Sequence, residues 1–177
     1  HSFPTRRSSD LPYRDKIHIA TKCPTWHVKK EEDFDILLNE QLKRLQTDYI
    51  DFYLMHALDK DRFDNIVVKY NLIDKLNKAK EDGKIRHIGF SFHDDCETFM
   101  RIIDSNPGWE FCQIQFNYIN LDYQAGMRGL EYAYEKGLYV VIMEPLLGGK
   151  LANPSPQVAE TLSQERTPVE WAMDFLW

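Results

Sequence analysis

The sequence has 177 residues and an ordinary globular composition, with 43% hydrophobic and 28% charged residues. It contains no apolar run near the roughly 18 residues that a membrane-spanning helix requires. The formal net charge of −6, without a dense Lys/Arg cluster, argues against nucleic acid as a partner. The three cysteines, Cys23, Cys96 and Cys112, are far apart and form no C-x-x-C pair. This spacing favours reduced thiols in a cytoplasmic protein over disulfides or a zinc site.

The first eleven residues do not share the pattern of the rest. Residues 1–11, HSFPTRRSSDL, resemble one translated frame of a common DNA-sequencing adapter. A basic targeting peptide is the other interpretation, but the stretch has neither an apolar core nor an amphipathic stripe. We therefore expect a non-native leader at 1–11 and natural sequence over 12–177, beginning within its gene.

The first two strands are predicted to end at ionisable residues. Ile17–Thr21 is strand-like and ends at Lys22. The run 50–55 alternates Ile, Phe and Leu with Asp, Tyr and Met, which favours a strand that stops at His56. Between the two strands, acidic residues at 31–33 suit the first turn of a helix. The apolar positions that follow at helical spacing are Phe34, Leu37, Leu38, Leu42 and Leu45.

Strands and helices then alternate to the end of the chain. Strands are predicted over 85–90, 111–116 and 138–143, and helices over about 65–82, 94–104 and 123–136. In the helix over 123–136, we expect Met127, Leu130 and Tyr134 to face inward. A final helix begins at the capping box of Thr167 and Glu170, with proline at its first helical position.

The resulting order is five strand–helix units, with strand starts that recur every 26 to 36 residues. Such helical crossovers connect parallel strands. A closed (β/α)₈ barrel usually needs about 250 residues. The chain is therefore either a complete five-stranded doubly wound domain or most of a truncated barrel. The adapter-like start and the uncapped last helix favour truncation.

Lys22 and His56 are the strongest candidates for chemistry. If both strands are parallel, the two residues lie at the carboxyl edge of the sheet, where α/β folds place their active sites. A lysine ammonium there lowers the pKa of a neighbouring acid, and a histidine donates a hydrogen bond to a substrate oxygen. Spacing alone leaves open a surface lysine and a structural histidine.

Other polar residues also follow predicted strands. Ser91, Gln115 and Asn117 have side chains suited to an amide or a phosphate, although such residues are also common in caps and turns. The glycines of Pro145–Gly149 would let backbone N–H groups approach a pyrophosphate. His93-Asp94-Asp95 suggests a metal site, but acids at a helix start are the better interpretation, so we predict no metal.

Five segments, in this order, resemble the aldo-keto reductase family. They are Ile19–Lys22, Tyr49–His56, Gly83–Ser91, Gln113–Tyr118 and Glu144–Leu151. The resemblance implies an α/β fold, a (β/α)₈ TIM barrel that transfers a hydride between NADPH and a carbonyl. This chain would be an incomplete barrel of about five βα units, strands three to seven. The phrases GFSFHDD and MEPLLGGKLANP are similar to a prokaryotic branch that often carries an iron–sulfur segment after the barrel.

The family's catalytic tetrad is Asp, Tyr, Lys and His. The tyrosine is the general acid, the lysine with its paired aspartate lowers the tyrosine pKa, and the histidine orients the carbonyl. Lys22 matches the tetrad lysine and His56 the tetrad histidine. The resemblance places the aspartate and the tyrosine upstream of Pro12. No tyrosine of this sequence stands at a position that matches the acid, and Tyr53 lies inside a strand.

The resemblance also implies how NADP would be held. Ser91 and Gln115 match the residues that hold the nicotinamide carboxamide. Met143 stands where many relatives stack a tyrosine on the nicotinamide. The pyrophosphate loop corresponds to Pro145, Leu146 and Gly148. NADPH, rather than NADH, follows only from the family.

Our leading interpretation is a fragment of an NAD(P)H-dependent aldo-keto reductase that acts on a small-molecule aldehyde or ketone. We expect the fragment itself to be inactive, and any iron–sulfur cluster to belong to the parent protein. The alternative is a nucleotide-binding barrel subunit with a redox-sensing or scaffolding role and little turnover. A self-sufficient doubly wound binding domain is a third interpretation.

Overall fold

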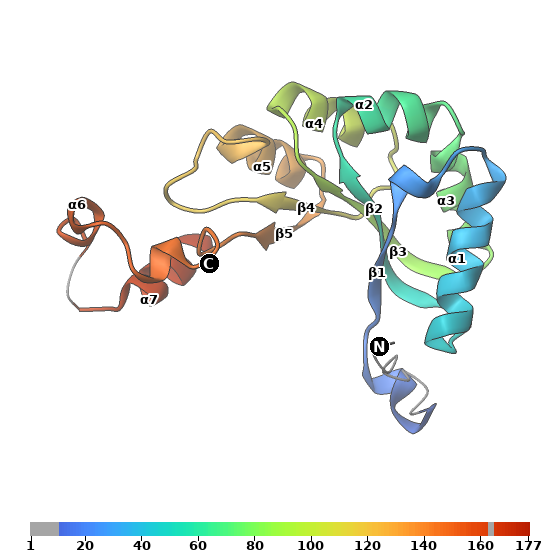
Figure 1. Cartoon of the computed structure of the whole chain (residues 1–177), viewed down its shortest axis with the longest axis horizontal. Coiled ribbons are helices and arrows are strands. Elements are labelled where there is room, and N and C mark those ends of the chain that lie inside the picture. The colour runs from blue at the N-terminus through green and yellow to red at the C-terminus, as the bar shows by residue number, and fades with distance from the viewer. Residues whose placement is uncertain (1–10, 163–164) are drawn as a thin grey trace.

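The computed structural model describes residues 11–162 and 165–177, which fold around one five-stranded sheet (Figure 1). The strands are β1 Ala20–Cys23, β2 Ile50–Leu58, β3 Ile85–Phe92, β4 Phe111–Gln115 and β5 Tyr139–Met143. The helices are α1 Glu32–Leu45, α2 Lys60–Arg62, α3 Leu72–Glu81, α4 Cys96–Asp104, α5 Gly126–Glu135, α6 Pro156–Ala159 and α7 Pro168–Leu176. Of the predicted leader, all but Leu11 lies outside the described residues. Within the described ranges, no helix has the length and apolarity to cross a membrane.

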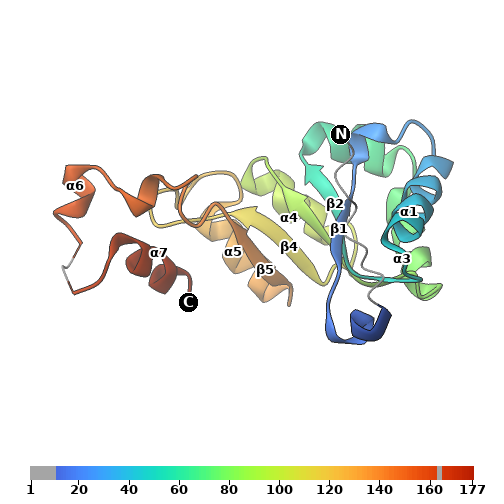
Figure 2. The same ribbon diagram turned by 60° about the horizontal axis from the view of Figure 1, so that its bottom comes forward.

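The strands lie side by side in chain order, β1-β2-β3-β4-β5, and every neighbouring pair is parallel. A doubly wound domain reverses its strand order at a switch point, so that interpretation is wrong. Sequential order with helical crossovers is the arrangement of a (β/α)₈ barrel. The chain is a partial α/β barrel, and Figures 1 and 2 show α1, α3, α4 and α5 along the outer side of the sheet.

The two faces of the sheet have different surroundings because strand residues alternate between them. The row of Cys23, Met55, Phe90 and Cys112 is fully buried on the helix side. The neighbouring row of Lys22, Leu54, Gly89 and Phe111 lies on the inner face. A hollow of about 870 Å³ opens on this inner face, and its apolar lining includes Phe52, Leu54, Phe111 and Val141.

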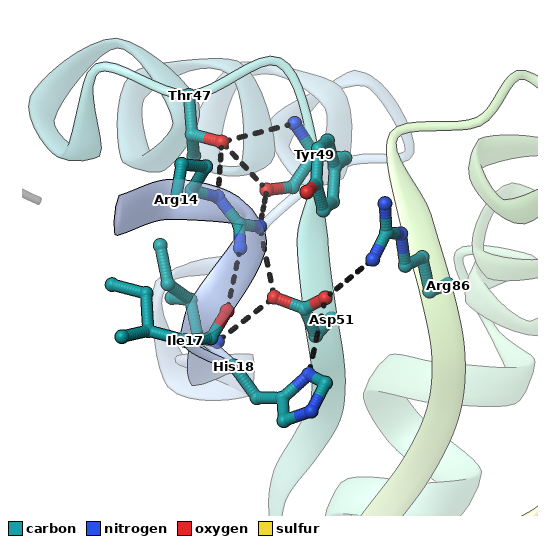
Figure 3. Close-up of polar contacts among 8 residues, drawn as sticks. Arg14, Ile17, His18, Thr47, Tyr49, Asp51 and Arg86 are labelled. Atoms are coloured by element: carbon teal, nitrogen blue, oxygen red, sulfur yellow. Dashed lines mark hydrogen bonds and ion pairs between the residues drawn. The ribbon is translucent and has the colours of Figure 1, made fainter. Parts of the chain in front are cut away.

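An ion-pair network ties the start of β1 to β2 and β3 (Figure 3). The Asp51 carboxylate is 1% exposed and accepts hydrogen bonds from the Ile19 N–H at 2.9 Å and from Arg86 at 3.0 Å. It also pairs with Arg14 Nη2 at 2.8 Å. The two guanidinium groups lie 3.9 and 3.7 Å from the centre of the Tyr49 ring. This network lies at the end of β2 opposite to His56.

The network explains why the first strand begins later than predicted. Because the Asp51 side chain takes the Ile19 N–H, regular pairing begins at Ala20 rather than at Ile17, and the strand includes Lys22. The second strand also differs from the prediction, since β2 continues past His56 to Leu58. A register irregularity between Met55 and Leu58 accompanies the positive φ of 54° at Ala57, and this bulge re-aims the side chains beyond Met55.

Two helix predictions need correction. The helix expected over 65–82 is broken into a π-helical turn at Phe63–Val68, which continues from α2, and α3, with Asn71 in a left-handed conformation between them. Tyr134 of α5 is 80% exposed rather than inward. The buried face of α5 carries Gly129 and Ala133 instead, because an added Cβ at Gly129 would meet Phe99 of α4 at 3.0 Å. The predicted capping box of α7 is confirmed.

We predict that Gly89→Ala destabilises the fold, because a Cβ at Gly89 would lie 2.4 Å from the Phe111 carbonyl oxygen and 2.8 Å from its ring. Overpacking of this kind costs about 1–3 kcal/mol. Urea unfolding of wild type and variant measures the loss. Gly83→Ala is the control, because nothing lies within 4 Å of its Cβ and only its φ of 76° is unfavourable. A Gly89→Ala midpoint equal to wild type would contradict close packing on the inner face.

Candidate active site at the carboxyl edge of the sheet

The structure brings Lys22 and His56 to one site. Both line a hollow of about 390 Å³ at the carboxyl edge of β1 and β2, together with Ala20, Thr21 and Leu54. The hollow is large enough for a small organic molecule, which could contact an ammonium and an imidazole at once. The two sequence candidates are therefore neighbours and not isolated surface groups.

Lys22 is fixed at both ends. Its main-chain carbonyl accepts a hydrogen bond from Gln41 Nε2 of α1 at 2.9 Å, and its Nζ donates to Gln113 Oε1 of β4 at 2.6 Å. Burial lowers the pKa of the Lys22 ammonium. The contact with β4 passes over β2 and β3, so it requires the curvature of a barrel wall.

His56 is held through its backbone and its ring. The Thr25 hydroxyl donates to the His56 carbonyl at 3.0 Å, and the Trp26 ring centre lies 4.9 Å from that of the imidazole. Burial lowers the pKa of His56, and the positive charges of Lys22 and Arg62 lower it further. The imidazole is thus predominantly neutral near pH 7, so one ring nitrogen donates and the other accepts.

Ser91 and Gln113 are register partners on β3 and β4. Ser91 is fully buried, and its Oγ accepts the Ala57 N–H at 2.8 Å, which holds the bulge that follows His56. Sequence analysis missed Gln113. Its two-residue spacing from Gln115 already places both glutamines on one face of the strand, but only the folded sheet shows that Gln113 reaches Lys22.

Gln115 and Met143 are register partners on β4 and β5, and Gln115 lies two residues beyond Gln113. Both side chains are partly exposed. Asn117 instead has a structural role. Its Nδ2 donates to the Glu144 carbonyl at 3.1 Å, and its Oδ1 accepts the N–H groups of Ile119 and Asn120. These contacts are those of a turn residue, and they join the loop after β4 to the loop after β5.

The loop Pro145–Gly149 is a tight turn built from left-handed residues. Leu147, Gly148 and Gly149 have φ values of 49°, 62° and 91°. Internal hydrogen bonds use the N–H groups of Leu147 and Gly149. In the described part of the chain, the N–H groups of Leu146 and Gly148 have no hydrogen-bond acceptor. The two amides flank Leu147 in a turn of left-handed residues, and backbone N–H groups left over in such a turn are suited to an anion.

The acidic residues after β3 are structural, as the sequence interpretation favoured. Asp95 caps α4 by accepting the Thr98 N–H at 2.8 Å, and Asp94 accepts the Lys60 N–H at 2.8 Å. Across residues 11–162 and 165–177, no cluster of three His, Cys, Asp or Glu side chains could hold a metal.

Tyr53 lies on the face of the sheet opposite to Lys22. It is fully buried on the helix side, and its ring centre is 6.2 Å from that of Phe34.

Barrel enzymes place their active sites at the carboxyl edge of the sheet, which is where Lys22 and His56 lie in this chain. The chain matches the model of the Aldo/keto reductase family over residues 7–172, and it belongs to that family. The match begins within the stretch 1–11, so the leader and the boundary at residue 12 remain a prediction.

The chain is similar to several characterised members. It is 28% identical to an L-galactose dehydrogenase of Arabidopsis thaliana over 158 residues, which cover 85% of this chain and 47% of the relative. It is 27% identical to the methylglyoxal reductase YeaE of Escherichia coli over 146 residues, covering 79% and 47%. The chain thus spans about half the length of these relatives.

Solved structures show the same fold. An aldo-keto reductase of Bacillus halodurans in its holo form matches with a TM-score of 0.74 and 20% identity, covering 92% of this chain and 59% of that one. An aldo/keto reductase of Klebsiella pneumoniae in complex with NADP and acetate matches with a TM-score of 0.70 and 22% identity, covering 93% and 57%.

Proposed function

We propose that the protein containing this chain is an NADPH-dependent reductase that transfers a hydride to an aldehyde or ketone. The observation that carries the proposal is the shared hollow of Lys22 and His56 in a chain of the aldo-keto reductase family. Related sequences named L-galactose dehydrogenase and methylglyoxal reductase support a small carbonyl or alcohol as the substrate class. We place the protein in the cytoplasm, from its cysteine usage.

Lys22 and His56 have separate roles in this proposal. The neutral His56 donates a hydrogen bond to the carbonyl oxygen and so orients it. Lys22 supplies a positive charge beside the developing alkoxide and lowers the pKa of the group that delivers the proton. Its contact with Gln113 keeps the ammonium on the inner face, where the carbonyl would lie.

In this proposal, residues at the carboxyl ends of β3, β4 and β5 hold a dinucleotide. When bound, NADPH supplies the hydride. Partly exposed Gln115 and Met143 would contact the nicotinamide, and Gln113, level with Ser91 in the register, adds an amide beside Lys22. The unpaired N–H groups of Leu146 and Gly148, next to Pro145, would receive the pyrophosphate. The Ser91 Oγ accepts the Ala57 N–H, so its own hydroxyl proton is still available, and in this proposal Ser91 donates it to the carboxamide.

We expect the 177-residue chain alone to lack turnover. Among the described tyrosines none makes a hydrogen bond with Lys22, whose ammonium bonds to Gln113 instead. The alternative function is a nucleotide-binding barrel subunit with a redox-sensing or scaffolding role, in which Lys22 would only join β1 to β4 through Gln113.

The test follows NADPH absorbance with methylglyoxal and benzaldehyde. The longest natural protein that contains this chain should oxidise NADPH with at least one of them, and the 177-residue chain should not. A missing general acid lowers the rate by about 10²–10⁴-fold. If the longer protein binds NADPH but turns over no carbonyl, the sensing or scaffolding role replaces the reductase proposal.

A further inference from the structure

His56 is followed by an irregular stretch of backbone. Regular pairing of β2 with β3 is interrupted between Met55 and Leu58, and Ala57 has a positive φ of 54°. This left-handed region is unfavourable for alanine, because its Cβ approaches the following carbonyl oxygen. The chain is anchored again at Leu58, whose carbonyl accepts the His93 N–H at 2.9 Å. Any relaxation of Ala57 would therefore shift the backbone of His56.

Both polar backbone groups of Ala57 are held by side chains. Its N–H donates to Ser91 Oγ of β3 at 2.8 Å, and its carbonyl accepts a hydrogen bond from Arg62 Nη1 at 2.8 Å. A hydrogen bond from a cationic donor is stronger than one between neutral groups. A strained backbone conformation persists only where the surroundings hold it in place, and here Arg62 supplies the charged contact.

Arg62 is itself fixed by Asp59. The Asp59 carboxylate accepts the Arg62 backbone N–H at 2.7 Å and also pairs with Nη1 of the guanidinium. The same nitrogen thus lies between a carboxylate and the Ala57 carbonyl. In this way Arg62 joins the end of α2 to the strained residue next to His56. The positive charge of Arg62 also lowers the pKa of His56, which favours the neutral imidazole.

We infer that Arg62 is a positioning residue, which holds Ala57 in its left-handed conformation and thereby places the His56 imidazole for the carbonyl oxygen of the substrate. The inference rests on the proposed reductase function and adds a residue that acts through the backbone without touching the substrate. Without the bond from Arg62, Ala57 would relax toward extended backbone and displace His56. A displacement of about 1 Å can lower a catalytic rate by about 100-fold.

The test measures steady-state kinetics of the longest natural protein that contains this chain, with NADPH and the better of methylglyoxal and benzaldehyde. Arg62→Met should lower kcat/KM for the carbonyl compound about 10- to 100-fold and leave the Kd of NADPH unchanged. Work at about pH 8, above the ordinary histidine pKa of about 6.5, removes any contribution from protonation of His56. Arg101→Met is the matched control, because Arg101 pairs with Asp64 of the π-helical turn, and it should leave kcat/KM unchanged.

A second substitution tests whether the conformation of Ala57 is the cause. Glycine adopts the left-handed region without strain, so Ala57→Gly added to Arg62→Met should raise kcat/KM by about threefold or more. Ala57→Gly alone should stay within roughly twofold of wild type. A merely structural role of Arg62 predicts no recovery, because Ala57→Gly adds no contact. Absence of recovery, or wild-type activity in Arg62→Met, overturns the inference.

An NMR measurement separates this inference from the proposed function. The Trp26 ring centre lies 4.9 Å from that of His56, so the ring current of the indole makes the imidazole proton resonances sensitive to the position of His56. Arg62→Met should move these resonances and Ala57→Gly should return them toward wild type, whereas Arg101→Met should not affect them. Unmoved resonances in Arg62→Met overturn the inference. If wild type reduces neither compound while the resonances respond as expected, the positioning of His56 by Arg62 is supported and the reductase proposal alone fails.

Discussion

Lys22→Met should lower kcat for aldehyde reduction by about 100-fold or more in the longest natural protein that contains this chain. Methionine preserves the length and apolar stem of lysine but removes the charge beside the developing alkoxide. Without that charge the proton donor has a higher pKa and is a weaker acid, and general-acid catalysis contributes about 10²–10⁴-fold. Stopped-flow measurement of NADPH oxidation at saturating substrate isolates the effect on kcat.

The pH dependence supplies a second readout. Burial lowers the pKa of Lys22 below its usual value, so the ammonium loses its proton at a lower pH than an exposed lysine does. The wild-type rate should therefore fall on the alkaline side, and this descending limb should be absent in Lys22→Met.

Two variants control the experiment. Lys29→Met removes an exposed charge outside the site and should leave kcat unchanged. Gln113→Leu leaves the ammonium in place but removes its acceptor, and should give an intermediate loss. Equal rates in wild type and Lys22→Met would remove Lys22 from the catalytic assignment.

Local sequence patterns were sufficient for much of the architecture. Three patterns depend only on residues that are near one another in the sequence: the helical spacing after Phe34, the alternation around Tyr53 and the capping box at Thr167. The elements they predict, α1, β2 and α7, are all present. Lys22 and His56 are predicted as candidates in the same way, because each lies near the end of an identifiable strand.

The features that were missed depend on partners far away in the sequence. β2 continues past His56 because Ser91, 34 residues beyond Ala57, accepts the Ala57 N–H. Gln113 becomes a site residue only through a contact with Lys22, 91 residues away. The prediction that Tyr134 faces inward was wrong, because the close approach of Phe99 to Gly129 centres the buried face of α5 on Gly129 and Ala133. Leu130, by contrast, packs against the core as predicted. Single-residue periodicity contains no information about these contacts.

The second large effect concerns stability. Asp51→Asn should destabilise the fold by about 3–5 kcal/mol, the usual loss when one partner of a buried ion pair is removed. The substitution keeps the shape of the side chain, but it leaves the Arg14 guanidinium, itself 7% exposed, without its counter-ion. Urea unfolding at pH 7 measures the difference. Glu40→Gln, which breaks an exposed pair with Arg44, should leave the unfolding midpoint nearly unchanged.

The same carboxylate predicts how stability depends on pH. Burial opposes ionisation of Asp51, but the Ile19 N–H and the Arg14 guanidinium outweigh it and hold the pKa of Asp51 below its usual value. The folded state therefore binds the proton less readily than the unfolded chain, whose aspartate pKa is about 3.9. The contribution of Asp51 is fully present above that value and is lost as the pH falls through the lower, folded-state pKa. Wild type and Asp51→Asn should consequently converge in stability below about pH 4. A difference that persists undiminished in strong acid would show that packing, and not the charge of Asp51, joins β1, β2 and β3 at this end of the sheet.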